Sequence, residues 1–154
     1  MKKFEGRYHY QECGLDNIYL NGGVFVTEVD GEECYSITDI EGLHKVIALD
    51  LINQQSPLCA KQFRFLRHEL GLTQKELAAK IDCTDQSIAL YEKGRPIPML
   101  VDAALRDLYK RGLFSKAIET LTAQKKKTVT TKPKNAVFKL NSKTGHYTKQ
   151  ANAA

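Results

Sequence analysis

Hydrophobic positions in residues 72–94 recur at helical spacing in two short runs, with a polar break between them. The first run places three apolar residues on one helical face: Leu77, Ala78 and Ile81. Thr73 and Glu76 form a Thr-x-x-Glu capping box, which pairs the free amides at the start of a helix. The pattern therefore predicts a short helix that begins near Thr73 and ends before the polar pair at residues 82–83.

The second run predicts another short helix. Thr84 suits its N-cap, Ile88 and Tyr91 are spaced for burial, and Gly94 follows the last periodic residue, as a C-terminal glycine should. Two helices this short bury little surface by themselves, so the polar start of the second one calls for a separate explanation. The simplest explanation is a recognition helix that places its first turn in the major groove of DNA. The alternative is an ordinary helical hairpin whose polar face is solvated.

The order of residues across this region resembles the Cro and phage-repressor helix-turn-helix, often called the XRE family. The resemblance covers roughly residues 60–113 and rests on Arg67…Leu72-Thr73-Gln74…Glu76-Leu77-Ala78…Gln86-Ser87-Ile88…Tyr91-Glu92-Lys93-Gly94. It implies a regulator of transcription, most simply a repressor, that binds double-stranded DNA. Because one recognition helix offers few contacts, we expect a homodimer on a palindromic operator with half-sites about 10 bp apart.

The expected DNA contacts cluster around the second helix and the start of the first: Gln74, Thr84, Asp85, Gln86, Ser87, Leu90, Lys93 and Arg95. The resemblance implies that Gln74 meets a phosphate, and Gln86 can pair bidentately with adenine. Asp85 departs from the neutral or basic residue usual in this family; it either accepts from a cytosine amino group or caps the helix dipole. Leu90 suits either a thymine methyl group or a subunit contact.

Two further residues of the motif have a structural role by resemblance. Arg67 and Glu92 are expected to pair with each other and to hold their two helices together. The dimer surface is expected on the helices at 99–123, with four apolar candidates: Leu100, Leu108, Leu113 and Phe114.

Residues 17–37 alternate in strand fashion around two turn signals, Asn21-Gly22 and Asp30-Gly31. This pattern predicts a three-stranded antiparallel meander. Thr38 and Glu41 form a second capping box, which opens a helix to about Asn53. The apolar stripe of that helix should cover the sheet: Ile40, Leu43, Ile47 and Leu51.

The predicted fold is therefore α+β. A small module at residues 1–55, the meander plus its helix, precedes an all-α, five-helix repressor-like domain at residues 56–123, with helices at 60–70, 99–112 and 115–123 beside the central pair. Residues 124–154 are rich in Lys, Thr and Asn, and we predict a disordered basic tail. Three apolar residues there are too isolated to build a core: Val137, Phe138 and Leu140.

Charge divides the chain more sharply than its total of +5 suggests. Residues 1–54 carry a net charge of −6, residues 55–114 carry +3, and residues 115–154 carry +8. The basic tail suits contact with phosphates or serves only for solubility. The acidic N-terminal third suits another partner: the layout is similar to antitoxins of type II toxin–antitoxin pairs, which would neutralise a basic toxin through residues 1–55 and autoregulate their operon. A small effector bound there is a further alternative.

The sequence predicts neither an enzyme nor a membrane protein. No apolar run approaches the length of a membrane span and no secretory leader pattern is present, so we expect a cytoplasmic protein. The histidines form no cluster with acids or thiols, and no phosphate-binding glycine loop appears. The four cysteines are widely spaced, which favours reduced thiols over a zinc site of Cys13, Cys34 and His9. We expect no cofactor and no metal.

Overall fold

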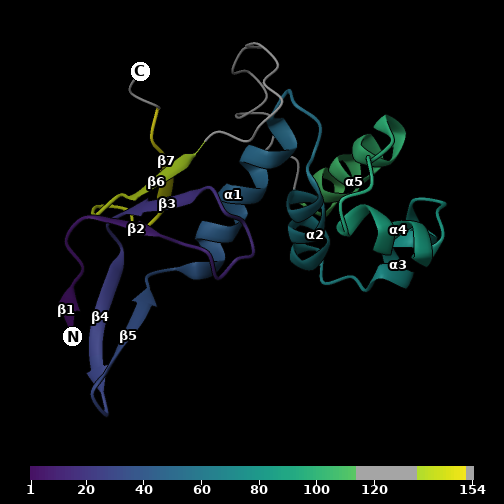
Figure 1. Ribbon diagram of the computed structural model, residues 1–154. Coiled ribbons are helices and arrows are strands. Elements are labelled where there is room, and N and C mark those ends of the chain that lie inside the picture. Colours follow the sequence, from purple (N-terminus) through teal and green to yellow (C-terminus); the bar gives the residue numbers. More distant parts are fainter. Residues whose placement is uncertain (114–134, 152–154) are drawn as a thin grey trace. The chain divides into compact units, whose positions relative to one another are not determined.

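The computed structural model describes residues 1–113 and 135–151 (Figure 1). The chain divides into two compact units, residues 1–47 with 132–154 and residues 48–131. The helix expected at 115–123 and the dimer candidate Phe114 lie outside the described residues.

The first unit contains two sheets. Sheet A is antiparallel and has the order β1-β4-β5, from β1 (Lys2–Lys3), β4 (Val24–Val29) and β5 (Glu32–Ile37). Sheet B has the order β2-β3-β6-β7, from β2 (Arg7–His9), β3 (Ile18–Asn21), β6 (Ala136–Leu140) and β7 (Tyr147–Lys149). In sheet B, β6 runs parallel to β3 and the other neighbours are antiparallel.

The hairpin predicted at Asp30-Gly31 is confirmed. Val29 pairs with Glu32, so two residues connect β4 to β5. Asp30 has φ 52° and Gly31 has φ 83°, the left-handed pair that a tight hairpin turn requires. Glycine adopts this conformation without steric cost, and Asp tolerates it better than most residues.

The three-stranded meander is wrong, because β3 and β4 belong to different sheets. The segment Asn21-Gly22-Gly23 carries the chain from sheet B to sheet A instead of folding it back on itself. Near this crossing the hydroxyl of the buried Tyr147 donates a hydrogen bond to the Gly23 carbonyl at 3.2 Å. The local turn sequence carries no information about such a partner, which lies more than a hundred residues away in the chain.

The disordered tail is also wrong for the described part of residues 124–154. Strands β6 and β7 complete sheet B, and β6 carries the fully buried Phe138 between Val137 and the half-buried Leu140. These apolar residues are too few to form a core by themselves. Because β6 pairs with β3, Phe138 and Leu140 share the apolar face that Ile18 and Leu20 begin, whereas Val137 lies opposite Tyr19 on the other face.

Helix α1 (Ile40–Asn53) ends where the sequence predicts, but its N-cap is Asp39 and not Thr38. Asp39 Oδ1 accepts a hydrogen bond from the Gly42 amide at 3.0 Å. A side chain at Gly42 would collide with that carboxylate, so any other residue there would have to displace the Asp39 cap. Leu43 is fully buried as expected, whereas Ile40 is 47% exposed and leaves the predicted stripe.

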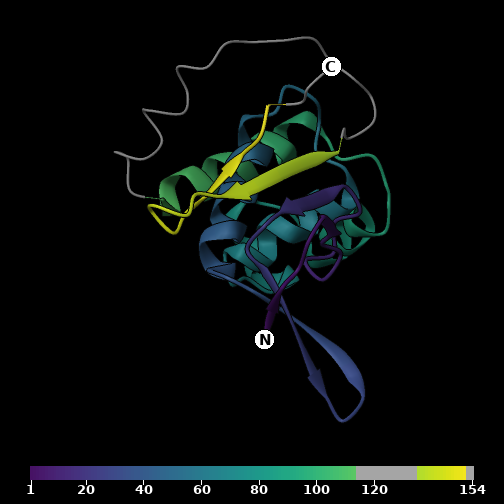
Figure 2. The same ribbon diagram turned by 90° about the vertical axis from the view of Figure 1, so that its left-hand side faces the viewer.

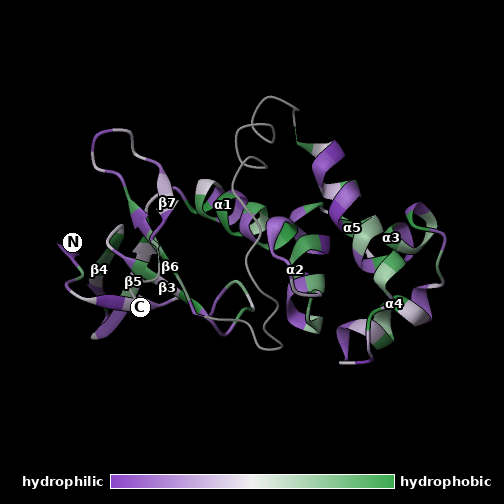
Figure 3. Cartoon of the chain, turned by 90° about the horizontal axis from the view of Figure 1, so that it is seen from above, coloured by the Kyte–Doolittle hydropathy of each residue, from purple (hydrophilic) through white to green (hydrophobic). Residues whose placement is uncertain are grey.

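The second unit contains four described helices after the end of α1, all of them predicted. They are α2 (Ala60–Glu69), α3 (Gln74–Lys80), α4 (Asp85–Glu92) and α5 (Met99–Gly112). Figure 3 shows that they carry both hydrophobic and hydrophilic residues, as helices around a shared core should. The fully buried side chains come from every one of these helices: Phe63, Leu66, Leu77, Ile88 and Leu105.

A buried ion pair on α5 holds the segment between α1 and α2. Asp102 and Arg106 pair at 2.5 Å, and Asp102 accepts from the Leu58 amide at 2.6 Å. Arg106 donates to the carbonyls of Gln54 at 2.6 Å and Ser56 at 2.7 Å. These bonds satisfy backbone groups that no helix pairs, and the hydrophobic pattern of α5 gave no sign of them.

Candidate nucleic-acid interface

The capping box predicted at the start of α3 is present. Thr73 Oγ1 accepts from the Glu76 amide at 3.2 Å, and Glu76 Oε2 accepts from the Thr73 amide at 2.8 Å. The hydrogen bond from the Thr73 backbone lowers the pKa of the Glu76 carboxyl. The start of α3 is thereby fixed, and the turn to α4 follows seven residues later.

That turn depends on Asp82 and Cys83. Asp82 has φ 54°, and the Cys83 amide bonds the Ala78 carbonyl at 2.9 Å, so the chain reverses within a few residues. Thr84 then caps α4, accepting from the Ser87 amide at 3.1 Å. The two short helices therefore meet through a tight turn, as a helix-turn-helix requires.

Arg67 and Glu92 form the ion pair that the sequence predicted. Arg67 Nε donates to Glu92 Oε1 at 2.5 Å and Nη2 donates to Oε2 at 3.0 Å, with the two side chains 8% and 5% exposed. Arg67 Nη1 also bonds the Leu72 carbonyl at 2.7 Å. This bidentate pair joins α2 to the last residue of α4 and to the loop before α3.

Gln74 is the third member of this network. Its side-chain Nε2 donates to Glu92 Oε2 at 2.9 Å, which links the first residue of α3 to the end of α4. Burial by itself raises the pKa of Glu92, but hydrogen bonds from Arg67 and Gln74 outweigh it and the net shift is downward. Glu92 therefore stays ionised at neutral pH.

The polar first turn of α4 faces solvent. Asp85 and Gln86 are exposed, and Ser87 is half-buried. Asp85 Oδ1 accepts from the Gln86 amide at 3.0 Å, so its carboxylate lies at the positive end of the helix. Thr84 donates its hydroxyl proton to Ser87 Oγ at 2.9 Å, and the exposed side chain of Gln86 is open to a ligand.

The remaining predicted contacts flank the far end of the same helix. Lys93 and Arg95 are exposed just after α4, and Leu90 is 43% exposed one turn before them. Gln74 and the seven predicted contact residues on and around α4 thus belong to two adjoining helices of one unit. The exposed polar turn suits contact with base edges, and the cations at the opposite end of the helix suit contact with phosphates.

Residues 63–103 match the family model described as helix-turn-helix. They are an XRE-type helix-turn-helix domain. The domain makes DNA the expected partner and transcription regulation the expected process. Comparison with curated proteins and with solved structures finds no match. The matched segment does not reach residues 1–55, so the antitoxin interpretation of that segment stays a prediction.

The described residues contain no group of three His, Cys, Asp or Glu side chains placed to hold a metal. All four cysteines lie in the described part of the chain and none of them forms a disulfide, including the candidate zinc ligands Cys13 and Cys34. No described helix is both long and apolar enough to cross a membrane.

Proposed function

We propose that this protein is a sequence-specific regulator of transcription, a repressor that binds a palindromic operator as a homodimer. The observation that carries the proposal is the network of Arg67, Glu92 and Gln74. It fixes α3 and α4 against α2 while the first turn of α4 stays exposed. A rigid scaffold that displays a polar helix start is what direct contact with base edges needs.

The proposal assigns a role to five of the predicted contact residues. Gln86 pairs bidentately with adenine, and Ser87 donates to a base or phosphate. Lys93 and Arg95 contact phosphates and set the orientation of the domain. Gln74 uses one amide hydrogen for Glu92 and has a second one for a phosphate.

Exposed apolar residues at the start of α5 are evidence for the proposed contact with a second copy of the domain. Met99 is 83% exposed and Leu100 is 81% exposed, although both are large apolar side chains. Leu108 and Leu113, the other described candidates, are half-buried. A surface formed around Leu100 would double the base contacts through two-fold symmetry.

The test is selection of bound duplexes from a randomised library. We expect enrichment of an inverted repeat whose half-sites lie about 10 bp apart from centre to centre. Leu100→Lys should shift the protein toward a monomer in ultracentrifugation and reduce affinity for the full repeat much more than for one half-site. Enrichment of a single asymmetric half-site, or of no sequence, would contradict the proposal.

A further inference from the structure

One face of sheet B is apolar and buried, and the opposite face is mostly polar and partly exposed. Alternation along β3 separates the buried Ile18 and Leu20 from the partly exposed Tyr19 and Asn21. Strand register extends the second set across the sheet, giving what we call the outer face of sheet B: Arg7, His9, Tyr19, Asn21, Val137, Lys139 and Thr148. Val137 is its one buried apolar member, 8% exposed opposite Tyr19. Figure 2 looks onto the strands of this sheet with α1 behind them.

The outer face carries a stack of planar groups. The rings of His9 and Tyr19 lie 4.5 Å apart between centroids with an interplanar angle of 12°. The Arg7 guanidinium lies over the Tyr19 ring, 6.0 Å from its centroid. The three side chains thus contact one another on this face, and none of them is buried.

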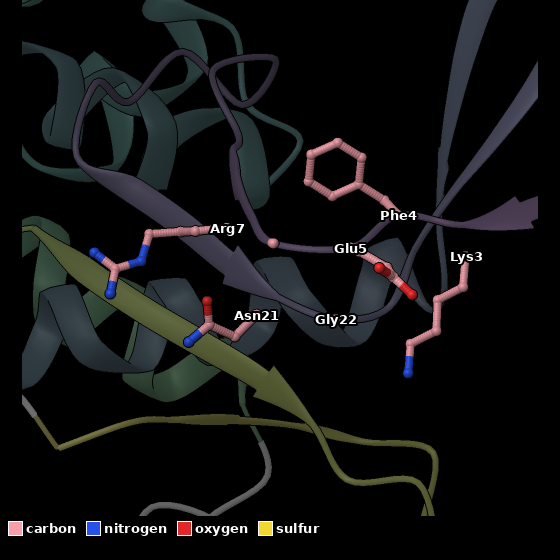
Figure 4. A pocket seen from close by; sticks show the side chains of 7 residues that line it. Lys3, Phe4, Glu5, Arg7, Asn21 and Gly22 are labelled. Carbon is pink, nitrogen blue, oxygen red and sulfur yellow. The ribbon is translucent and has the colours of Figure 1, made fainter.

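Next to this stack, an open pocket of about 600 Å³ lies where the chain passes between the two sheets. Figure 4 shows Arg7 and Lys3 toward opposite ends of it, with Asn21 between them. Phe4 supplies an aromatic ring, Gly6 and Gly22 leave backbone uncovered, and Glu5 is the one carboxylate in the lining. A hydrogen bond of 2.7 Å from Asn21 to Gln150 crosses β6 and fixes the amide.

We propose that the outer face of sheet B, together with this pocket, binds single-stranded nucleic acid. Bases extend the stack of the His9 and Tyr19 rings, one of them by replacing the Arg7 guanidinium on Tyr19, and phosphates meet the cations on both sides of the stack: Lys3, Arg7 and Lys139. Open sheet faces with stacked aromatic groups and flanking cations suit a single strand, whose bases are free to stack, better than a duplex, whose bases are already stacked. This surface belongs to the first unit and α4 to the second, so the proposal does not depend on the proposed operator binding.

The charge of Glu5 distinguishes a nucleic acid from a small zwitterionic ligand, because it should affect the binding of the two in opposite directions. A ligand with an amino group would use Glu5 as a partner, so Glu5→Gln would weaken its binding. A phosphate backbone is repelled by Glu5, so the same substitution should tighten binding of a nucleic acid.

The experiment measures fluorescence anisotropy of a labelled 12-nucleotide oligo(dT) with the full-length protein and its variants. Arg7→Gln removes one cation from the stack, and Lys45→Gln removes one exposed cation from α1 as the control for charge. Tyr19→Val removes the ring, and Tyr19→Phe keeps it as the control for folding. Gln86→Ala separates this surface from the helix-turn-helix.

We expect Tyr19→Val and Arg7→Gln to weaken oligo(dT) binding about tenfold or more, while Tyr19→Phe, Lys45→Gln and Gln86→Ala change it little. We expect Glu5→Gln to tighten it, and unlabelled single strand to compete better than a duplex of equal length. The proposal is overturned if the protein does not bind oligo(dT), if Tyr19→Val binds as the parent does, if Glu5→Gln weakens binding, or if the duplex competes equally well.

Discussion

Arg67 and Glu92 lie 25 residues apart in the sequence and form a buried bidentate ion pair in the fold. The pair joins α2 to the end of α4, and Gln74 extends it to the start of α3. Three helices of the domain are thus tied together by a single carboxylate.

Removal of this carboxylate should destabilise the domain strongly. Glu92→Ala leaves Arg67 buried without its charged partner, and we expect a loss of about 3–5 kcal/mol in the free energy of unfolding. Asp107→Ala is the matched control, because it removes an exposed partner of Arg111 on α5 and should cost less than about 1 kcal/mol. Urea denaturation of both variants makes the comparison, and equal small losses would refute a structural role for the pair.

The same pair predicts a dependence of stability on pH. The pKa of Glu92 is lowered in the fold, so its contribution is complete above the unfolded glutamate pKa of about 4.3 and disappears as the pH falls through the lower, folded value. The stability advantage of the parent over Glu92→Gln should therefore be constant near neutral pH and shrink as the solution is acidified below about pH 4. An advantage that grew on acidification would reverse the sign of the proposed linkage.

The sequence predicted the second unit far better than the first, for a physical reason. The helices α2 to α5 are encoded by local spacing and caps, such as Thr73 with Glu76, which sequence neighbours make visible. Sheet B depends on the parallel pairing of β6 with β3, and Phe138 gains its burial only from that distant partner. The i,i+4 spacing of Asp102 and Arg106 allows their ion pair, but their hydrogen bonds to the segment before α2 were missed because backbone groups carry no sequence signal.

The burial of Phe138 predicts that the C-terminal strands are necessary for the first unit. Phe138→Ala should lower the free energy of unfolding of this unit by about 3–5 kcal/mol, since it empties a fully buried site. Val29→Ala removes an apolar side chain that is 51% exposed and should change it little. Amide hydrogen exchange of β2 and β3 reports the effect, and parent-like protection in Phe138→Ala would show that β6 does not support the sheet.

The basic composition of the C-terminal part predicts a salt-dependent contribution to DNA binding. Truncation cannot test it, because removal of residues 124–154 would also remove β6 and β7. Replacement of Lys125, Lys126 and Lys127 by glutamine avoids this problem. Each of these lysines that contacts a phosphate should contribute about 0.9 to the slope of log affinity against log salt. The variant should thus show a flatter slope on cognate and scrambled duplexes alike, with base preference retained; an unchanged slope would mean that the three lysines only aid solubility.

The central claim is that the first turn of α4 determines which DNA sequence this protein binds, and Gln86→Ala tests it most directly. The measurement is affinity of parent and variant for the selected duplex and for duplexes substituted at each base pair in turn. We predict a loss of about 1–3 kcal/mol that is confined to one base pair per half-site, with preference at that position relaxed and the melting temperature unchanged. An unchanged affinity and an unchanged preference at every base pair would contradict the account.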